Sequence, residues 1–379
     1  MSRLAMFVLG LLLGLGSDWG SPPAILEART FLVDGVQITT LQAGIDSAAA
    51  GDTVLVAGGT WGGAGNRDLD FNGKDLVLKS VLGADQTTID SGGSPAEPHR
   101  AFDFHSGETV QAVVEGFTIT GGVLTGGQST GSGTGIRIRQ GSGVTVLDCV
   151  VAGNVSVDDV SGGGISVEEN SELVLTRCSL IGNTAVAGAG LGCLGGSTVT
   201  ITDCLITGNQ GGGIFCDDQG TTLDVIGTTI SGNMADSVGG GIFSISAPTV
   251  TVERSIIWGN CSPVNSGNEI YVQLAGNFRF TCSVVDTSTS AKVYFADAVV
   301  RAFDADVIAD DPLFCAPEAC QSAPSESGNY ALAVGSPCLA ASSPCGQQMG
   351  ALGLGIGCGT VSALPATWGE LKARYRRPE

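Results

Sequence analysis

The chain carries one short motif five times, and this repeat limits the fold more than any other feature. Each copy is an apolar run that ends in Gly-Asn, and successive copies lie 24 to 29 residues apart. A period of this length is typical of architectures in which each repeat packs against its neighbours. The copies are VTVLDCVVAGN (144–154), LVLTRCSLIGN (173–183), VTITDCLITGN (199–209), LDVIGTTISGN (223–233) and VTVERSIIWGN (250–260).

The period inside each copy predicts strands. Runs such as VTV and LVL alternate with a period of two and are rich in β-branched residues. A second recurring element, Gly-Gly-Gly-Ile or a close variant, separates the copies, and no helical stretch lies between them. Parallel strands joined without helices can stack only as a coil. We therefore predict an all-β fold, a right-handed parallel β-helix of roughly ten coils with a capping helix at its N-terminal end.

Stacked coils place equivalent residues in columns. The position five residues before each Asn is small or apolar, which suits an inward column, and the Asn residues suit a hydrogen-bonded ladder at a turn. The flanking segments align Phe117 and Cys282 with the inward column. The predicted inward column is Cys149, Cys178, Cys204, Thr228 and Ser255, and the predicted ladder is Asn154, Asn183, Asn209, Asn233 and Asn260.

Composition excludes several classes of function. Acidic residues outnumber basic ones 37 to 17, a net charge of −20, and charged residues make up only 14% of the chain. Nucleic-acid binding requires a basic surface, so no nucleic-acid partner is expected. With 43% hydrophobic residues the chain is not disordered. We expect a monomer.

The two ends differ from the repeat. Arg3 is followed by an apolar run from Leu4 to Leu15, which predicts an export signal too short to span a membrane permanently. The mature chain is then expected to have no transmembrane helix and to be secreted or held at the cell surface. The predicted organisation is a signal peptide (1–24), an N-terminal cap with an amphipathic helix (25–51), the β-helix (52–300), a Cys-rich C-terminal cap (301–360) and a basic tail (361–379).

The twelve cysteines fall into two groups. The column members, together with Cys193 and Cys216, are expected to be reduced and buried. The chain has no CxxC pair and only two histidines, so a zinc site is not favoured, and whether any other metal binds stays open. Two or three bridges are expected at the C-terminal end, with no pairing assigned, among Cys261, Cys315, Cys320, Cys338, Cys345 and Cys358.

Several segments resemble a known superfamily. TTLQAGIDSAAAGDTVLVAGGTW (39–61) resembles the entry cap of right-handed parallel β-helix proteins of the pectate-lyase-like superfamily. The Gly-Gly-Gly-Ile and Gly-Asn repeats are similar to those of polymorphic outer-membrane-protein-like surface proteins. DPLF (311–314), YALAVGSPCL (330–339) and CGQQMGALG (345–353) resemble the closing module of exported bacterial β-helix proteins. The resemblance implies fold and export but leaves the chemistry open, because the superfamily includes lyases, glycosidases, epimerases and non-catalytic surface proteins.

The strand after each Gly-Gly-Gly-Ile element supplies the candidate binding residues. Its alternate positions point outward, and two of them, Phe215 and Phe243, fall on adjacent coils. Two exposed rings at one strand spacing are suited to stacking on a sugar ring. A polysaccharide or cell-surface glycan is therefore the expected partner.

The same outward positions supply a candidate catalytic set. Arg139 lies beside Glu168, either as a surface ion pair or as part of a site for a charged glycan. A lyase needs a base and neutralisation of the substrate carboxylate. Arg137, Arg139, Glu168 and Asp217 are the residues that fit those roles.

The sequence favours a non-catalytic role. A glycosidase needs paired carboxylates across the scissile bond, and no motif of that kind stands out. We therefore predict a secreted or cell-surface β-helix protein with a structural or glycan-binding role and no cofactor. The alternative is a polysaccharide lyase or glycoside hydrolase of the pectate-lyase-like class, with calcium as the candidate cofactor if it is a lyase.

Overall fold

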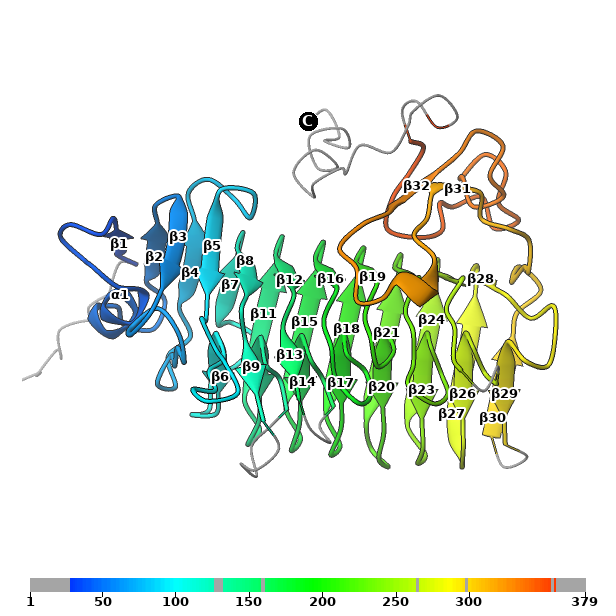
Figure 1. Cartoon of the computed structure of the whole chain (residues 1–379), viewed down its shortest axis with the longest axis horizontal. Helices are drawn as coiled ribbons and strands as arrows, with labels where there is room; N and C mark the ends of the chain where they lie inside the picture. The colour runs from blue at the N-terminus through cyan, green and yellow to red at the C-terminus, as the bar shows by residue number, and fades with distance from the viewer. Residues whose placement is uncertain are drawn as a thin grey trace, which may run out of the picture.

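The computed structural model describes residues 28–125, 132–157, 161–263, 266–296, 299–355 and 358. The predicted signal peptide and basic tail lie outside these residues. The described chain winds as a solenoid in which most coils contribute one strand to each of three parallel sheets, here called A, B and C (Figure 1). A typical coil runs from sheet C to sheet A to sheet B, as β10 (Ile136–Ile138), β11 (Gly143–Leu147) and β12 (Val150–Ala152) do.

The described strands divide among the sheets as follows. The other strands of sheet A are β1 (Thr30–Val33), β2 (Thr53–Val56), β4 (Val77–Ser80), β7 (Val113–Glu115), β15 (Glu172–Thr176), β18 (Thr198–Thr202), β21 (Thr222–Ile226), β24 (Thr249–Glu253), β27 (Gly276–Thr281) and β30 (Val299–Phe303). Those of sheet B are β3 (Gly59–Gly62), β5 (Thr87–Asp90), β8 (Thr118–Thr120), β16 (Ser179–Ile181), β19 (Leu205–Thr207), β22 (Thr229–Ser231), β25 (Ile256–Trp258) and β28 (Val284–Val285). Those of sheet C are β6 (Phe102–Phe104), β14 (Ile165–Val167), β17 (Leu191–Cys193), β20 (Ile214–Cys216), β23 (Ile242–Ser244), β26 (Ile270–Val272) and β29 (Val293–Phe295). Two short pairs complete the set: β9 (Val123–Leu124) with β13 (Val155–Ser156), and β31 (Phe314–Ala316) with β32 (Asn329–Leu332).

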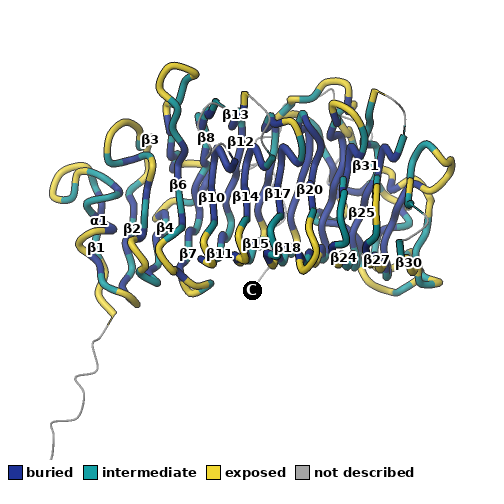
Figure 2. Tube along the Cα trace, turned by 90° about the horizontal axis from the view of Figure 1, so that it is seen from below, coloured by how far each residue is buried: buried dark blue, intermediate teal, exposed yellow. Residues whose placement is uncertain are grey.

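The predicted fold class is confirmed: the protein is an all-β parallel solenoid of roughly ten coils. Strands pair in register, so each inward residue stacks on its equivalent one coil away. One inward column of sheet C is fully buried: Ile136, Ile165, Leu191, Ile214, Ile242 and Ile270. The strands are dark with burial in Figure 2 and the turns are exposed.

A short helix covers the start of the solenoid. Helix α1 (Leu41–Ser47) is capped by the Thr40 side chain, which accepts a hydrogen bond from the Ala43 N–H. Its buried residues Leu41 and Ile45 join the core of the first coils. None of the described helices is long and apolar enough to cross a membrane.

The five asparagines form a continuous buried ladder. In each step the backbone N–H and the side-chain amide of one Asn donate to the Oδ1 of the next, at 2.8–3.1 Å. Each side-chain amide also donates to a backbone carbonyl of the preceding coil; that of Asn183, for example, donates to Val151 O at 2.9 Å. The ladder therefore ties each coil to both neighbours without water.

The inward column is hydrogen-bonded from coil to coil in the same way as the asparagine ladder, except at Cys282. Backbone N–H groups donate to the side chain one coil on, from Cys149 to Cys178 and from Cys178 to Cys204, both at 3.3 Å. The prediction for Cys282 is wrong by one residue, because the Ser255 N–H donates to Ser283 Oγ. Cys282 instead occupies the preceding corner position, with φ of 47°, and forms a disulfide.

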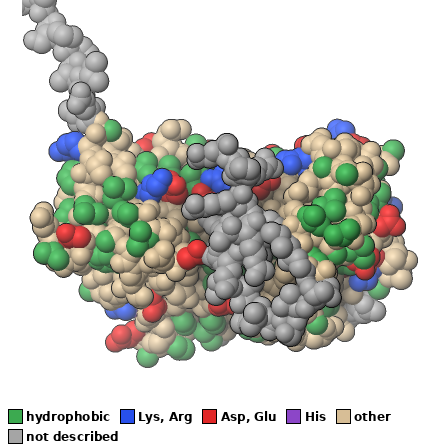
Figure 3. Space-filling model, turned by 90° about the horizontal axis from the view of Figure 1, so that it is seen from above, with side chains coloured by type: hydrophobic (Ala, Val, Ile, Leu, Met, Phe, Trp, Pro, Cys, Tyr) green, Lys and Arg blue, Asp and Glu red, His purple; other side chains and the backbone are tan. Residues whose placement is uncertain are grey.

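The Cys-rich C-terminal module is present, and its described part lies alongside the solenoid. Residues 311–355, here called the side cap, pack on the outer face of sheet B (Figure 1). Leu205 of β19 and Ile256 of β25 belong to the apolar clusters that the side cap forms with this face. Figure 3 views the molecule from this side.

Three disulfides hold the side cap. Two join it to the solenoid and one lies within the C-terminal region: Cys261–Cys320, Cys282–Cys345 and Cys315–Cys358. Cys338, which was grouped with the bridging cysteines, is reduced and buried.

The glycine before each ladder asparagine has two roles. Gly153, Gly182, Gly208 and Gly232 have φ of 62–67°, which a side chain disfavours. A Cβ at Gly208 would lie 2.0 Å from Ser325 O, and one at Gly232 would lie 2.6 Å from the Tyr330 hydroxyl. The repeated glycine therefore permits the backbone conformation of the turn and leaves room for the side cap to pack against it.

The last coil ends on aromatic rings. Phe303 of β30 stacks on Phe280 with centroids 4.5 Å apart, and the Arg301 guanidinium lies 5.5 Å from the ring centre of Phe295. Arg301 stands opposite Phe278, at a position that is apolar in earlier coils. A charged side chain thus covers this end of the core.

Replacing Asn183 with Ala is expected to lower the free energy of unfolding by about 2 kcal/mol, because the Asn154 donors lose their buried acceptor. Asn277, exposed on sheet A, is the matched control. Chemical denaturation of both variants measures the difference. Equal midpoints for Asn183→Ala and Asn277→Ala would contradict the role given to the ladder.

Candidate functional site

The outer face of sheet C brings the predicted site residues onto one surface. Strand register places Arg137 opposite Asp103 on one side and opposite Ser166 on the other. Toward the other end of the sheet the same outward column becomes aromatic. In order, the column is Asp103, Arg137, Ser166, Gly192, Phe215, Phe243, Tyr271 and Tyr294. One face therefore has a charged end and an aromatic end.

The charged end is a set of ion pairs whose partners differ from the prediction. Arg139 does not pair with Glu168; it makes a bidentate contact with Asp103, both bonds at 3.1 Å. Glu168 pairs instead with Arg137 at 3.1 Å and accepts hydrogen bonds from the Ser166 and Ser132 hydroxyls.

These contacts keep the groups charged. Burial alone would raise the pKa values of Asp103 and Glu168, but their hydrogen bonds and the arginines hold both below the usual range. The hydrogen bond to Asp103 raises the pKa of Arg139. A guanidinium stabilised in this way is a poor general base.

Two further arginine features were not anticipated from the sequence. Arg137 is only 6% exposed, and its Nε and Nη1 atoms have no hydrogen-bond partner among the described residues. Arg100 is also buried, and its Nη1 donates to Ser132 O at 3.1 Å. Burial lowers the pKa of Arg100 to about 10, partly opposed by Asp103. Arg100 escaped the sequence analysis because it precedes β6, in a coil without the Gly-Asn motif.

Asp217 does not join this cluster. It stands two coils beyond Glu168, roughly 10 Å along the axis, and one of its oxygens accepts the Ser246 N–H at 2.5 Å. Leu194 occupies the equivalent position on the coil between them. The four predicted catalytic residues therefore form one ion-paired cluster and one separate aspartate.

The described carboxylates do not gather to chelate a hard cation. The one group of three potential ligands within the described ranges is Cys282, Asp306 and Cys345, with donor atoms within 4.8 Å. Its two sulfur atoms are joined in a disulfide, so they offer no thiolate.

The aromatic end is longer and less open than predicted. Phe215 is only 7% exposed because the turn at Gly188 packs against it, so its prediction as an open sugar platform is wrong. Phe243 is half-buried and lies 5.1 Å from Phe215, centroid to centroid. Tyr271 and Tyr294 continue the column at 5.9 and 4.7 Å, and Tyr294 is 41% exposed.

Tyr271 and Tyr294 were not predicted from the sequence because the repeat changes after Phe243. The next coil replaces Gly-Gly-Gly-Ile with Gly-Asn-Glu-Ile, so its strand was not recognised as equivalent. The residue after Ile270 is Tyr271, which pairs with Phe243 in register. An inward Ile followed by an outward ring is the sequence signal that could have identified it.

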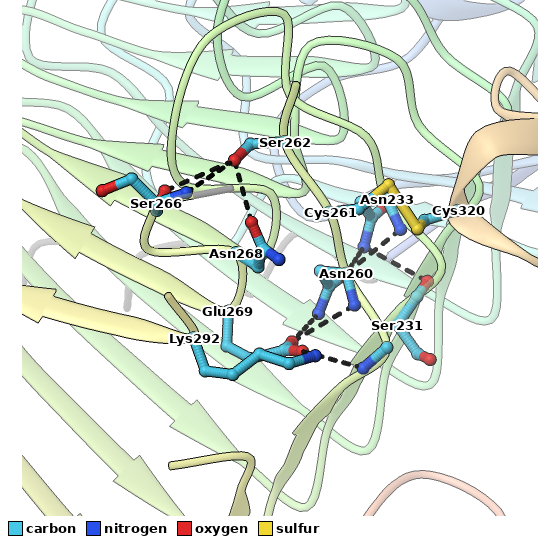
Figure 4. The surroundings of a disulfide bond; sticks show 11 residues. Ser231, Asn233, Asn260, Cys261, Ser262, Ser266, Asn268, Glu269, Lys292 and Cys320 are labelled. Carbon is cyan, nitrogen blue, oxygen red and sulfur yellow. Dashed lines mark hydrogen bonds and ion pairs between the residues drawn. A yellow bond between two sulfur atoms is a disulfide. The ribbon is translucent and has the colours of Figure 1, made fainter. Parts of the chain in front are cut away.

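Glu269, from this Gly-Asn-Glu-Ile element, ends the asparagine ladder (Figure 4). Glu269 Oε2 accepts the Asn260 backbone N–H at 3.2 Å and its side-chain amide at 2.7 Å, and Oε1 accepts the Gly259 N–H at 3.0 Å. A carboxylate thus takes the place of the next amide oxygen. Lys292 lies 3.5 Å from Glu269 and 2.9 Å from Asp286.

Burial dominates the ionisation of Glu269. The side chain is fully buried, which raises its pKa to about 7 despite the Asn260 hydrogen bonds and Lys292. Lys292 lowers it only in part because that ammonium is shared with Asp286. Among the other buried groups, burial raises the pKa of the Cys149 and Cys178 thiols well above the ordinary value. Those thiols are protonated and unreactive.

Two comparisons find known proteins to which this chain is similar. Residues 103–233 match the family described as "Right handed beta helix region". The crystal structure of pectate lyase Pel9A is similar with a TM-score of 0.46 and 13% identity, over 86% of this chain and 96% of that chain. No curated protein sequence matches the chain. The family match over residues 103–233 agrees with the parallel solenoid of the structure.

The pKa of Glu269 predicts a distinctive pH dependence. A raised pKa means that the folded state holds the proton more tightly than the unfolded state, so stability falls as pH rises from about 4.5 to about 7. The loss from this group is at most about 3 kcal/mol. Denaturation of the wild type and of Glu269→Gln across this range measures it. The variant is expected to lack this component, and parallel stability curves would contradict the assignment.

Proposed function

We propose that the protein is an extracellular, non-catalytic β-helix that binds a glycan chain on the outer face of sheet C. The observation that supports this most is the aromatic column that ends in exposed Tyr294. Phe243 and Tyr271 extend the column along the solenoid axis, at one ring per coil. A linear polysaccharide lying along the axis would meet one ring after another.

The terminal ring is best placed for sugar stacking. The rings of Tyr271 and Tyr294 are stacked with an angle of 17° between their planes, so each covers one face of the other. Strand β29 is the edge of sheet C, and no described strand stacks beyond Tyr294. Its outer face is therefore available to the apolar face of a sugar, while the tyrosine hydroxyls can bond sugar hydroxyls.

Two features support a location outside the cytoplasm. Three disulfides join the side cap to the solenoid and to itself, and such bonds persist in oxidising compartments. The net charge of −20 keeps a rigid surface protein soluble and suits repeated weak contacts.

The geometry favours binding over catalysis. Arg139 is held by Asp103 and Glu168 by Arg137, so neither pair has a free group of the kind that would remove a proton. Asp217 is too far along the axis to act with them.

A lyase is the second candidate, and one observation favours it. Arg137 and Arg100 are both buried at this end of the face, and among the described residues two guanidinium nitrogens of Arg137 have no hydrogen-bond partner, so the pair could bind the carboxylate of a uronic acid. Calcium does not fit the described carboxylates, which are not gathered, so no step is derived through it.

The glycan proposal predicts the effect of removing the rings. Tyr271→Leu/Tyr294→Leu is expected to weaken binding on a glycan array at least about tenfold, because Tyr294 supplies the stacking face and Tyr271 supports its ring from behind. Tyr271→Phe/Tyr294→Phe keeps the rings and is expected to retain most binding. Full binding by the leucine variant, with an unchanged melting curve, would contradict the proposal.

A second measurement separates binding from catalysis. The purified protein is incubated with uronic-acid polysaccharides and calcium, and unsaturated product is followed by absorbance and reducing ends by titration. No product is expected. Product formation that is abolished by Arg137→Lys would replace the binding role with the lyase.

A further inference from the structure

A second candidate site lies at the outer face of sheet B rather than that of sheet C. A cavity of about 590 Å³ opens between the outer face of sheet B and the side cap. Trp258, at the end of β25, lines it from the solenoid, and Asp311, Phe314 and Glu318 line it from the side cap. Its volume is in the range of small-ligand sites.

The walls of this cavity are fixed in place. The Cys261–Cys320 disulfide joins solenoid and side cap at the cavity, three residues from Trp258 (Figure 4). Phe314 packs edge-on against Tyr330, with centroids 5.5 Å apart. A site whose two walls are cross-linked loses little entropy when a ligand binds.

The mouth of the cavity includes a strained residue. Leu313 has φ of 52°, an unfavourable conformation for a branched side chain, and its N–H donates to Asp311 Oδ1 at 2.8 Å. Its side chain is 41% exposed although it lines the cavity. The backbone turn thus presents an apolar side chain and a carboxylate together.

The charged residues that line the cavity are acidic. Asp311 and Glu318 line it, and no Lys, Arg or His does so among the described residues. Neither carboxylate has an ion pair within the described ranges, and the Glu318 carboxylate has no hydrogen bond there either. Asp311, Glu318 and Trp258 therefore line one cavity to which the described residues contribute no basic side chain.

We propose that this cavity binds an organic cation, an ammonium or guanidinium group on a short aliphatic stem. Trp258 offers the ring face that attracts cations most strongly, and the two carboxylates supply charge-assisted acceptors. Leu313 and Phe314 supply apolar contact for the stem.

The cation has two conceivable sources with the same chemistry. One is a ligand or a partner's side chain. The other is this chain, whose last residues include Lys372, Arg374, Arg376 and Arg377. Cys358, the last described residue, is bonded to Cys315, the sequence neighbour of Phe314.

The experiment uses Nα-acetyl-arginine amide and its uncharged isostere Nα-acetyl-citrulline amide, titrated into the full-length protein by calorimetry. The arginine compound is expected to bind at one site and at least about tenfold more tightly than the citrulline compound. Asp311→Asn/Glu318→Gln is expected to remove that preference. Glu172→Gln/Asp224→Asn makes the same change of charge on exposed positions of sheet A and is expected to keep it.

A full-length variant with Lys372, Arg374, Arg376 and Arg377 all changed to Gln identifies the source. Binding that is tighter in this variant indicates competition by the chain's own basic residues, and unchanged binding indicates a site open to external cations. The proposal is overturned if neither chain binds the arginine compound, if citrulline binds equally well, or if both carboxylate pairs have the same effect.

Discussion

The alignment of each coil on the next is the constraint on which the rest of the structure depends. Fully buried amides of five asparagines carry it, each bonded to both neighbouring coils. Buried polar groups are costly unless satisfied, so a shift of one residue would leave every step of the ladder unpaired. The ladder ends on the Glu269 carboxylate, which satisfies the last donors at the cost of burying an ionisable group.

Because the coils are aligned, the outward residues of each sheet form continuous columns on the surface. Outward residues of sheet C fall into one column, with ion pairs around Arg137 at one end and rings up to Tyr294 at the other. Outward residues of sheet B meet the side cap, which can approach because the Gly-Asn glycines lack side chains. The proposed glycan face and the proposed cation cavity thus lie on different sheets and depend on the same stacking.

Much of this was accessible from the sequence because period and column position follow from the repeat. The inward isoleucines, the asparagines and the thiols occupy the columns that alternation assigns them. Alternation predicts which residues point outward, but it does not predict which other segments cover them. Phe215 points outward yet is buried under the turn at Gly188, and Arg139 chooses Asp103 over Glu168 through side-chain geometry. Likewise, the unbroken register of β24 with β27 makes Cys282 the equivalent of the corner residue Arg254, so that Ser283 occupies the inward column.

The most direct test of this account is hydrogen exchange at the backbone amides of the ladder asparagines. Each of Asn154, Asn183, Asn209 and Asn233 donates its N–H to the next asparagine, so exchange requires the coils to separate. The account predicts that all four exchange together, with the free energy of global unfolding. Independent and faster exchange of single members would show that the coils are held by their apolar core and that the ladder is incidental.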